Sequence, residues 1–176
     1  MSDVFFPKID AWRIPQSALE KSWAEMALDG QRGDEGIALW LGSHDSGQAI
    51  VQAVVALRGP GIIKRPGLIR IESALFNEVA DAALDRGMIL VGHVHSHGGT
   101  FVDLSPTDRA YGVGVPHYLS VVAPHRALQQ PQIADCGVHV FEPRGYFRRL
   151  PPQEVRERIL VERNDDVPIV IVGGGP

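Results

Sequence analysis

The apolar run from Met88 to His95, which ends in two histidines, is the feature that most restricts the fold of this sequence. Such a continuous run is typical of a central strand that is buried on both faces. Because alternate side chains of a strand point to one face, His95 and His97 project together at its C-terminal end. The two imidazoles can therefore bind one ion.

A carboxylate at Asp108, eleven positions after His97, completes a possible ligand set. Two histidines and one acid are ligands that a catalytic zinc takes, and they leave a fourth position for water. His93 lies on the same face while the strand stays regular, so His93 and His95 with Asp103 form an alternative set. The spacing favours His95, His97 and Asp108.

The segment from Ser105 to Asp108 also has an explanation that involves no metal. Ser at the N-cap, Pro106 at the first helical position and Asp108 at the third form a capping box. The two interpretations are compatible, because one carboxylate oxygen can accept the Ser105 amide while the other binds zinc. The hydroxyl of Ser105 can accept from the helix and still donate its proton toward an oxyanion.

A zinc hydrolase also needs a general base, and the nearest candidate lies upstream. Glu35 stands just before the apolar run that begins at Ile37. Most glutamates in such a place are only solvated, so the residues alone leave a catalytic role open.

The rest of the chain predicts an α/β fold in one domain that spans residues 1–176, a length that supports a core of its own. Periodicity and turn residues predict helices over 18–28 and 72–86, one beginning at Pro106 and a short one over 156–161; strands over 37–41, 49–57, 68–71, 88–95, 118–122, 138–141 and 168–172; a loop over 59–67; and a frayed tail over 173–176. The loop Gly59–Gly67 is either a flap over a substrate or a plain surface loop.

Composition excludes several classes of protein. The net charge of −4 is spread without a long basic run, so we expect no nucleic-acid or acidic-membrane partner. The single cysteine, Cys136, excludes an internal disulfide and fits a reducing cytoplasm. No run of about 18 apolar residues occurs and the N-terminus has no signal-peptide pattern, so we expect neither membrane insertion nor secretion.

Together these residues resemble the JAMM signature of the JAB/MPN metalloprotease family. The family pattern is a glutamate leading into an apolar strand that ends in glycine, then His-x-His-x10-Asp with a serine three residues before the aspartate. Glu35 stands seven residues before Gly42, and the second part is matched by His95, His97, Ser105 and Asp108. The resemblance covers roughly residues 35–122.

The resemblance implies a curved, mixed and mainly antiparallel sheet packed with helices. It also implies one Zn²⁺ held by His95, His97 and Asp108 with a catalytic water, Glu35 as general base and acid, and Ser105 as oxyanion donor. The expected activity is cleavage after the C-terminal Gly-Gly of a ubiquitin-like modifier. This compact chain is similar to the prokaryotic branch, whose members accompany such modifiers and their activating and conjugating enzymes, sometimes in antiviral defence.

Two other functions remain open. One is trimming of a ubiquitin-like sulfur-carrier protein, and the other is a metal-free scaffold. Three positions depart from the family pattern: Gly98 replaces a common proline, His93 a frequent aromatic residue, and Ala38 an inner glycine. None removes a ligand, although His93 can add a contact behind the metal site.

Overall fold

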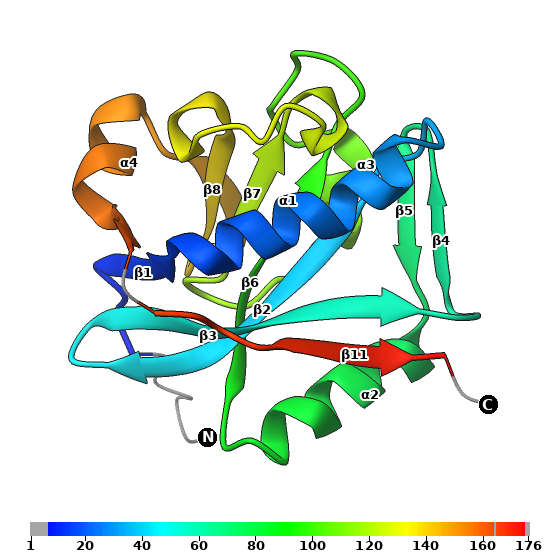
Figure 1. Cartoon of the computed structure of the whole chain (residues 1–176). Coiled ribbons are helices and arrows are strands. Elements are labelled where there is room, and N and C mark those ends of the chain that lie inside the picture. Colours follow the sequence, from blue (N-terminus) through cyan, green and yellow to red (C-terminus); the bar gives the residue numbers. More distant parts are fainter. Residues whose placement is uncertain (1–6, 164, 175–176) are drawn as a thin grey trace.

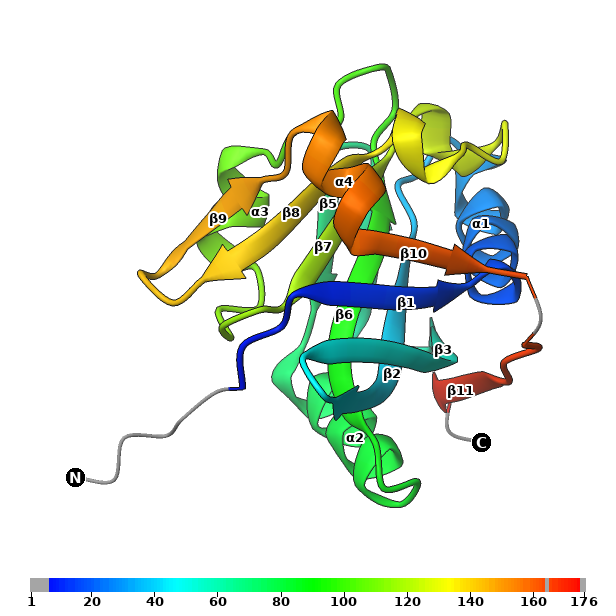
Figure 2. The same ribbon diagram turned by 90° about the vertical axis from the view of Figure 1, so that its left-hand side faces the viewer.

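A strongly curled mixed sheet forms the body of the protein (Figures 1 and 2). The computed structural model describes residues 7–163 and 165–174. Over these residues the strands of the large sheet follow the order β10-β1-β3-β2-β6-β7-β8-β9, and β11 pairs with β3. These strands are β1 (Ala11–Pro15), β2 (Ile37–Asp45), β3 (Gln48–Arg58), β6 (Ile89–Ser96), β7 (Leu119–Ala123), β8 (Gly137–Glu142), β9 (Tyr146–Arg149), β10 (Ile159–Glu162) and β11 (Ile169–Gly173).

Strand β6, which ends in the two histidines, lies at the centre of the sheet, as its sequence predicts. It pairs antiparallel with β2 and parallel with β7. Strands β2 and β3, which contain the segments predicted over 37–41 and 49–57, form an antiparallel hairpin that turns at Ser46 and Gly47. A Cβ at Gly42 would lie 1.8 Å from the carbonyl oxygen of Ile50, so the close approach of β2 and β3 requires glycine there.

The two faces of the sheet carry different helices (Figure 1). Helix α1 (Gln16–Gly30) packs on one face with a core that includes Trp40, and α2 (Ser73–Leu84) packs on the other face with Leu39 and Leu41. This division follows from the alternation of side chains along β2. Trp40 is fully buried, and its indole N–H donates to the hydroxyl of Ser22 at 3.0 Å.

The predicted α/β fold with a curved mixed sheet is confirmed, and the helix that begins at Pro106 is α3 (Pro106–Tyr111). Parallel pairing is more frequent than expected, because β1 joins β3 and β10 in parallel and β11 joins β3 in parallel. The pattern gave no sign of β1, whose five residues alternate only briefly, nor of the short 3₁₀ turns η1 (His125–Ala127) and η2 (Ile133–Asp135).

Three predicted segments need correction. The loop expected over 59–67 contains β4 (Ile62–Arg65), which pairs antiparallel with β5 (Leu68–Ile71) in a separate small sheet. The helix expected over 156–161 is α4 (Pro152–Arg158) followed by β10, because Pro152 starts the helix and the β-branched Ile159 begins a strand. Gly173 belongs to β11 rather than to a frayed tail, and residues 175–176 of that tail lie outside the described residues.

Within the described part of the chain, each helix is too short or too polar to cross a bilayer.

Candidate metal centre

Three side chains from β6 and the start of α3 converge on one point. Ligand atoms of His95, His97 and Asp108 all lie within 4.8 Å of one another. Atom Nε2 of His97 lies 3.3 Å from Oδ2 of Asp108, and Nε2 of His95 lies 3.6 Å from the same oxygen. Strand β6 supplies His95, the first residue after β6 supplies His97, and the first turn of α3 supplies the acid.

His95 has the free donor atom that a metal ligand needs. Its Nε2 is buried, and in the described residues it has no hydrogen-bond partner. Leaving such an atom unpaired costs about 1–3 kcal/mol, which coordination to a metal would offset. Two nitrogens and one oxygen also form a donor set that zinc accepts. The residues therefore fit a divalent ion of this kind.

A chain of hydrogen bonds behind His95 selects the tautomer that exposes this atom. Atom Nδ1 of His95 lies 3.2 Å from Nε2 of His93, whose own Nδ1 lies 2.9 Å from the hydroxyl of Tyr118. If Nδ1–H of His95 donates to His93, its Nε2 keeps the lone pair for a metal. Burial and the nearby His95 lower the pKa of His93 to about 3, so His93 stays neutral and able to accept.

His97 is oriented in the same way from the loop that follows β6. Its Nδ1–H donates to the carbonyl of Phe101 at 2.9 Å, which turns Nε2 toward Asp108. The ring of Phe101, 61% exposed, stacks on the imidazole with the planes 2° apart. Burial lowers the pKa of His97, but hydrogen bonds to Asp108 and Phe101 outweigh it, and the net pKa is raised.

Asp108 serves the helix cap and the ligand cluster at once. The Ser105 amide donates to Oδ2 of Asp108 at 2.7 Å, and the Asp108 amide donates to the Ser105 hydroxyl at 3.1 Å. The same Oδ2 faces both histidines. Burial would raise the pKa of Asp108, but the nearby imidazoles of His95 and His97 and the hydrogen bond from Ser105 hold it far below its usual range. The carboxylate is therefore ionised at neutral pH, as a metal ligand must be.

Glu35 approaches this cluster from the neighbouring strand. Ile37 pairs with His95, and one step further the amide of Ser96 donates to the carbonyl of Gly36 at 2.9 Å. The ladder therefore brings Glu35 opposite His97, and the charge of Glu35 contributes to the raised pKa of His97. The glutamate side chain is partly exposed.

A cleft of about 880 Å³ opens beside the cluster and exposes both polar and apolar walls. His95 and Asp108 line it, together with His93, Tyr118 and Ser120. All four residues of β5 also line it, as do Thr107 and Tyr111 of α3 and Gly112 at its C-terminal end.

The alternative ligand set is not assembled. Oδ1 of Asp103 accepts from His139 at 2.7 Å and from Arg109 at 2.9 Å. Asp103 therefore ties the loop after β6 to β8. His139 is fully buried and fixes this loop.

Other side chains that could bear chemistry lie apart from the cluster. His44 is exposed, and His117 and His125 are partly exposed. Burial raises the pKa of the Cys136 thiol to about 12, which excludes a thiolate nucleophile at neutral pH.

Sequence reasoning missed two residues that shape the site. Ser96, between the two histidines, points to the opposite face, where its hydroxyl accepts the amide of Gly36 at 2.9 Å. The period-2 alternation of β6 could have indicated this role. Arg126, whose Nε donates to the carbonyl of Gly33 at 3.1 Å, gave no local signal, because its partner is 93 residues away.

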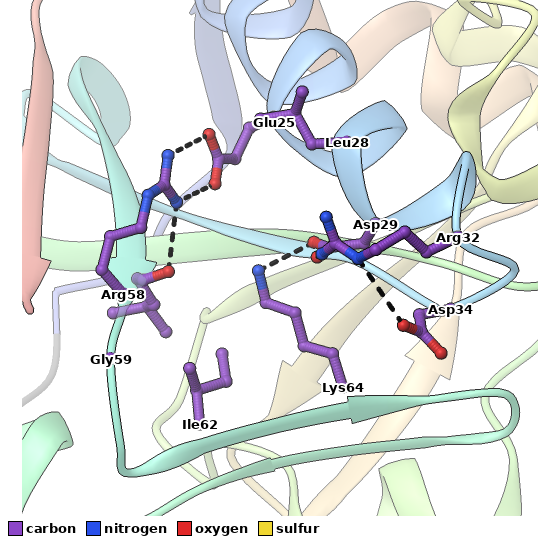
Figure 3. Close-up of a pocket in the computed structure, with 10 residues that line it drawn as sticks. Glu25, Leu28, Asp29, Arg32, Asp34, Arg58, Gly59, Ile62 and Lys64 are labelled. Carbon is purple, nitrogen blue, oxygen red and sulfur yellow. Dashed lines mark hydrogen bonds and ion pairs between the residues drawn. The ribbon is translucent and has the colours of Figure 1, made fainter.

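A second cleft of about 380 Å³ lies between α1 and β4 (Figure 3). Its charged side chains pair with one another: Arg58 with Glu25, and Lys64 with Asp29 at 2.7 Å. Arg32 also binds Asp29, at 2.6 Å. The Lys64–Asp29 pair fastens β4 to α1, and the Arg58–Glu25 pair joins the end of β3 to α1.

Comparison with known proteins adds independent information. No family model matches the chain. A probable metalloprotease, y4jG of Sinorhizobium fredii, is 23% identical over 150 residues, which cover 84% of this chain and 92% of that protein. The solution structure of protein DSY2949 from Desulfitobacterium hafniense superposes with a TM-score of 0.66 at 16% identity and covers 87% of this chain and 94% of its own.

The JAB1/MPN domain protein AF2198 of Archaeoglobus fulgidus is a more distant structural neighbour, with a TM-score of 0.46, 14% identity and coverage of 87% of this chain and 98% of that one. The convergent histidines and aspartate and the metalloprotease relative agree with the JAMM motif. The similarity to a metalloprotease is consistent with the predicted resemblance to the JAB/MPN family. Glu35 lies just before β2, His95 lies in β6, His97 follows β6, and Asp108 lies in α3.

Proposed function

We propose that this protein is a metal-dependent peptidase of the JAB/MPN type that cleaves after the C-terminal Gly-Gly of a ubiquitin-like modifier. The observation that carries the proposal is the convergence of His95, His97 and Asp108 beside a cleft that His95 and Asp108 line. The metalloprotease relative supports the general reaction, hydrolysis of a peptide bond.

Zn²⁺ held by these three residues would lower the pKa of a water ligand toward about 7 and polarise the substrate carbonyl. Glu35 would accept the proton of the attacking water and return it to the departing amine. The Ser105 hydroxyl, which already accepts the Asp108 amide, keeps its own proton to donate to the developing oxyanion.

The form of the cleft supports an extended substrate. Consecutive side chains of a strand alternate, so all four residues of β5 can line the cleft only if β5 turns its backbone edge toward it. Such an edge can pair with an extended peptide. We propose that the C-terminal tail of a modifier lies along β5, with its two glycines beside Asp108.

The test is hydrolysis of a modifier that ends in Gly-Gly and is linked to a fluorescent amine. We expect Zn²⁺-dependent release that chelation abolishes, and a loss of about 10²–10⁴-fold in Glu35→Gln, the range attributed to general acid–base catalysis. Glu20→Gln, on the exposed face of α1, is the matched control.

Three forms of substrate distinguish the alternatives. Release from an isopeptide conjugate indicates deconjugation, and release from a linear precursor indicates maturation. Trimming confined to a sulfur-carrier precursor would indicate that the protein processes a ubiquitin-like sulfur-carrier protein instead. No cleavage of any of the three by zinc-loaded protein would contradict peptidase activity and favour a scaffold.

A further inference from the structure

A left-handed turn between β7 and η2 lies directly behind the loop that follows β6 and carries His97. His125, Arg126 and Ala127 have φ values of 52°, 55° and 57°, and none of them is glycine. For residues other than glycine this conformation is less favourable than the right-handed one, because Cβ comes too close to the following carbonyl oxygen. Three in a row persist only where the surrounding contacts hold them, and strain of this kind is concentrated at functional sites.

Backbone hydrogen bonds clasp this turn to the loop after β6. The amide of Arg126 donates to the carbonyl of His97 at 2.8 Å, and the amide of His125 donates to the carbonyl of Gly99 at 2.9 Å. In return, the amide of His97 donates to the carbonyl of Ala123 at 2.9 Å. The backbone of a candidate metal ligand is therefore fixed by the turn.

The side chain of Arg126 extends from this turn to the loop that carries Glu35. Its Nε donates to the carbonyl of Gly33 at 3.1 Å, two residues before the glutamate. Its Nη2 lies so close to Gly98 that an added Cβ would be 3.1 Å away. One guanidinium thus contacts the residue after His97 and the loop before Glu35.

The end of α1 packs against the same residue. A Cβ at Gly30 would lie 2.8 Å from the carbonyl oxygen of Arg126, so glycine is needed where the helix meets the turn. Beyond Glu35, the amide of Gly36 is held by Ser96 at 2.9 Å. Arg126 therefore anchors the upstream side of the Glu35 loop, and Ser96 anchors the downstream side.

We infer that Arg126 is a positioning residue that sets the distance between Glu35 and the ligands on β6. This inference rests on the proposed function, because the distance matters only if Glu35 acts as the general base at the metal site. A planar guanidinium can donate to Gly33 and lie against Gly98 at once, whereas a lysine ammonium has no flat face to cover Gly98. A misplacement of about 1 Å at a reacting group can cost about 10²-fold in rate.

Glycine substitutions within the turn give the sharpest test. Arg126→Gly removes the guanidinium and relieves the strained φ, so the variant is not expected to unfold. His125→Gly relieves the same strain and keeps Arg126, which makes it the matched control. The first measurement is hydrogen exchange at the Glu35 and Gly36 amides, which requires no activity.

We expect exchange at these two amides to accelerate about 10-fold or more in Arg126→Gly, as in a locally opened segment, and to stay near wild type in His125→Gly. With the fluorescent substrate, kcat should fall about 10- to 100-fold in Arg126→Gly with KM nearly unchanged. Bound zinc should remain at one equivalent per chain, and added guanidinium ion at low concentration should restore part of kcat.

Equal exchange rates and equal kcat in the two glycine variants would overturn the inference. If wild-type protein cleaves none of the substrates, the proposed function fails while the exchange measurement still tests whether Arg126 orders the Glu35 loop. Faster exchange with unchanged kcat in an active protein would show that Arg126 orders the loop without positioning Glu35 for the reaction, and would also overturn the inference.

Discussion

Ser105 and Asp108 hydrogen-bond to each other in both directions, side chain to backbone, at 3.1 Å and 2.7 Å. The oxygen with which Asp108 accepts the Ser105 amide is also the one that faces His95 and His97. The cap of α3 thus holds the carboxylate still for a metal.

Replacing this serine should affect stability and catalysis to different extents. Ser105→Ala removes a cap worth about 1 kcal/mol. It also removes the proposed oxyanion donor, for which kcat should fall by about 10²–10³-fold. Ser105→Thr keeps the hydroxyl and serves as control. Denaturant unfolding measures the loss of stability, and steady-state kinetics measures the loss of kcat. If Ser105→Ala lowers the free energy of unfolding by about 1 kcal/mol but lowers kcat by less than about 10-fold, the oxyanion role is contradicted.

Zinc should stabilise the folded protein through the candidate ligands. Free Zn²⁺ at about 100 times its Kd should add about 2.7 kcal/mol to the free energy of unfolding. We expect His95→Ala to abolish this gain, and His44→Ala, which alters an exposed histidine, to retain it. Thermal melts with and without the metal check this, and an equal gain in both variants would exclude His95 as a ligand.

His93 should strengthen metal binding although it is not a ligand itself. His93→Phe supplies the aromatic residue common in the family but removes the acceptor for Nδ1–H of His95. We expect zinc affinity to fall about 10- to 100-fold, as for other partners of metal-bound histidines. Ser120→Ala, which removes only the hydroxyl 3.1 Å from His93, should have a smaller effect. Chelator competition measures both, and unchanged affinity in His93→Phe would refute the role.

Sequence patterns predicted those parts of the fold that depend on local periodicity. The run ending at His95 predicted the central strand, and Ser105 with Pro106 predicted the start of α3, because both signals lie within a few residues. Strands β1 and β10 escaped prediction, since each is short and gains its stability from parallel neighbours far along the chain. β4 was hidden because the prolines and glycines around it are typical of a loop.

The residues of the candidate site also differ in whether a local sequence pattern predicted them. The spacing indicated His95, His97 and Asp108, and the resemblance to the JAMM signature added Glu35. The alternation of β6 could have indicated the role of Ser96, whereas the contacts of Phe101 and Arg126 follow from no local pattern. Whether Asp103 served as a ligand also depended on the position of His139 in a distant strand.

The β4–β5 hairpin should influence substrate binding more than chemistry. Lys64→Met keeps the apolar stem but removes the ion pair with the buried Asp29, so the hairpin is expected to loosen from α1 (Figure 3). We expect KM to rise more than kcat falls, because β5 forms the wall of the cleft. Lys21→Met, which removes a pair with the exposed Asp166, is the control. A Lys64→Met variant with a lower kcat and an unchanged KM would contradict this role.

Acid should destabilise the metal-free protein partly through His139. Burial lowers the pKa of His139, although the hydrogen bond to Asp103 opposes this, and Arg149 and Arg109 add to the lowering. Below about pH 6.5 the imidazole of His139 is protonated in the unfolded chain but still neutral in the folded protein. The free energy of unfolding therefore decreases as the pH falls toward the folded pKa, with a limiting slope of about 1.4 kcal/mol per pH unit. His139→Gln keeps a donor for Asp103 but does not titrate. Its unfolding free energy, measured by denaturant between pH 7 and pH 5, should therefore decline less steeply than that of wild type, and parallel curves would show that His139 takes up its proton equally in both states.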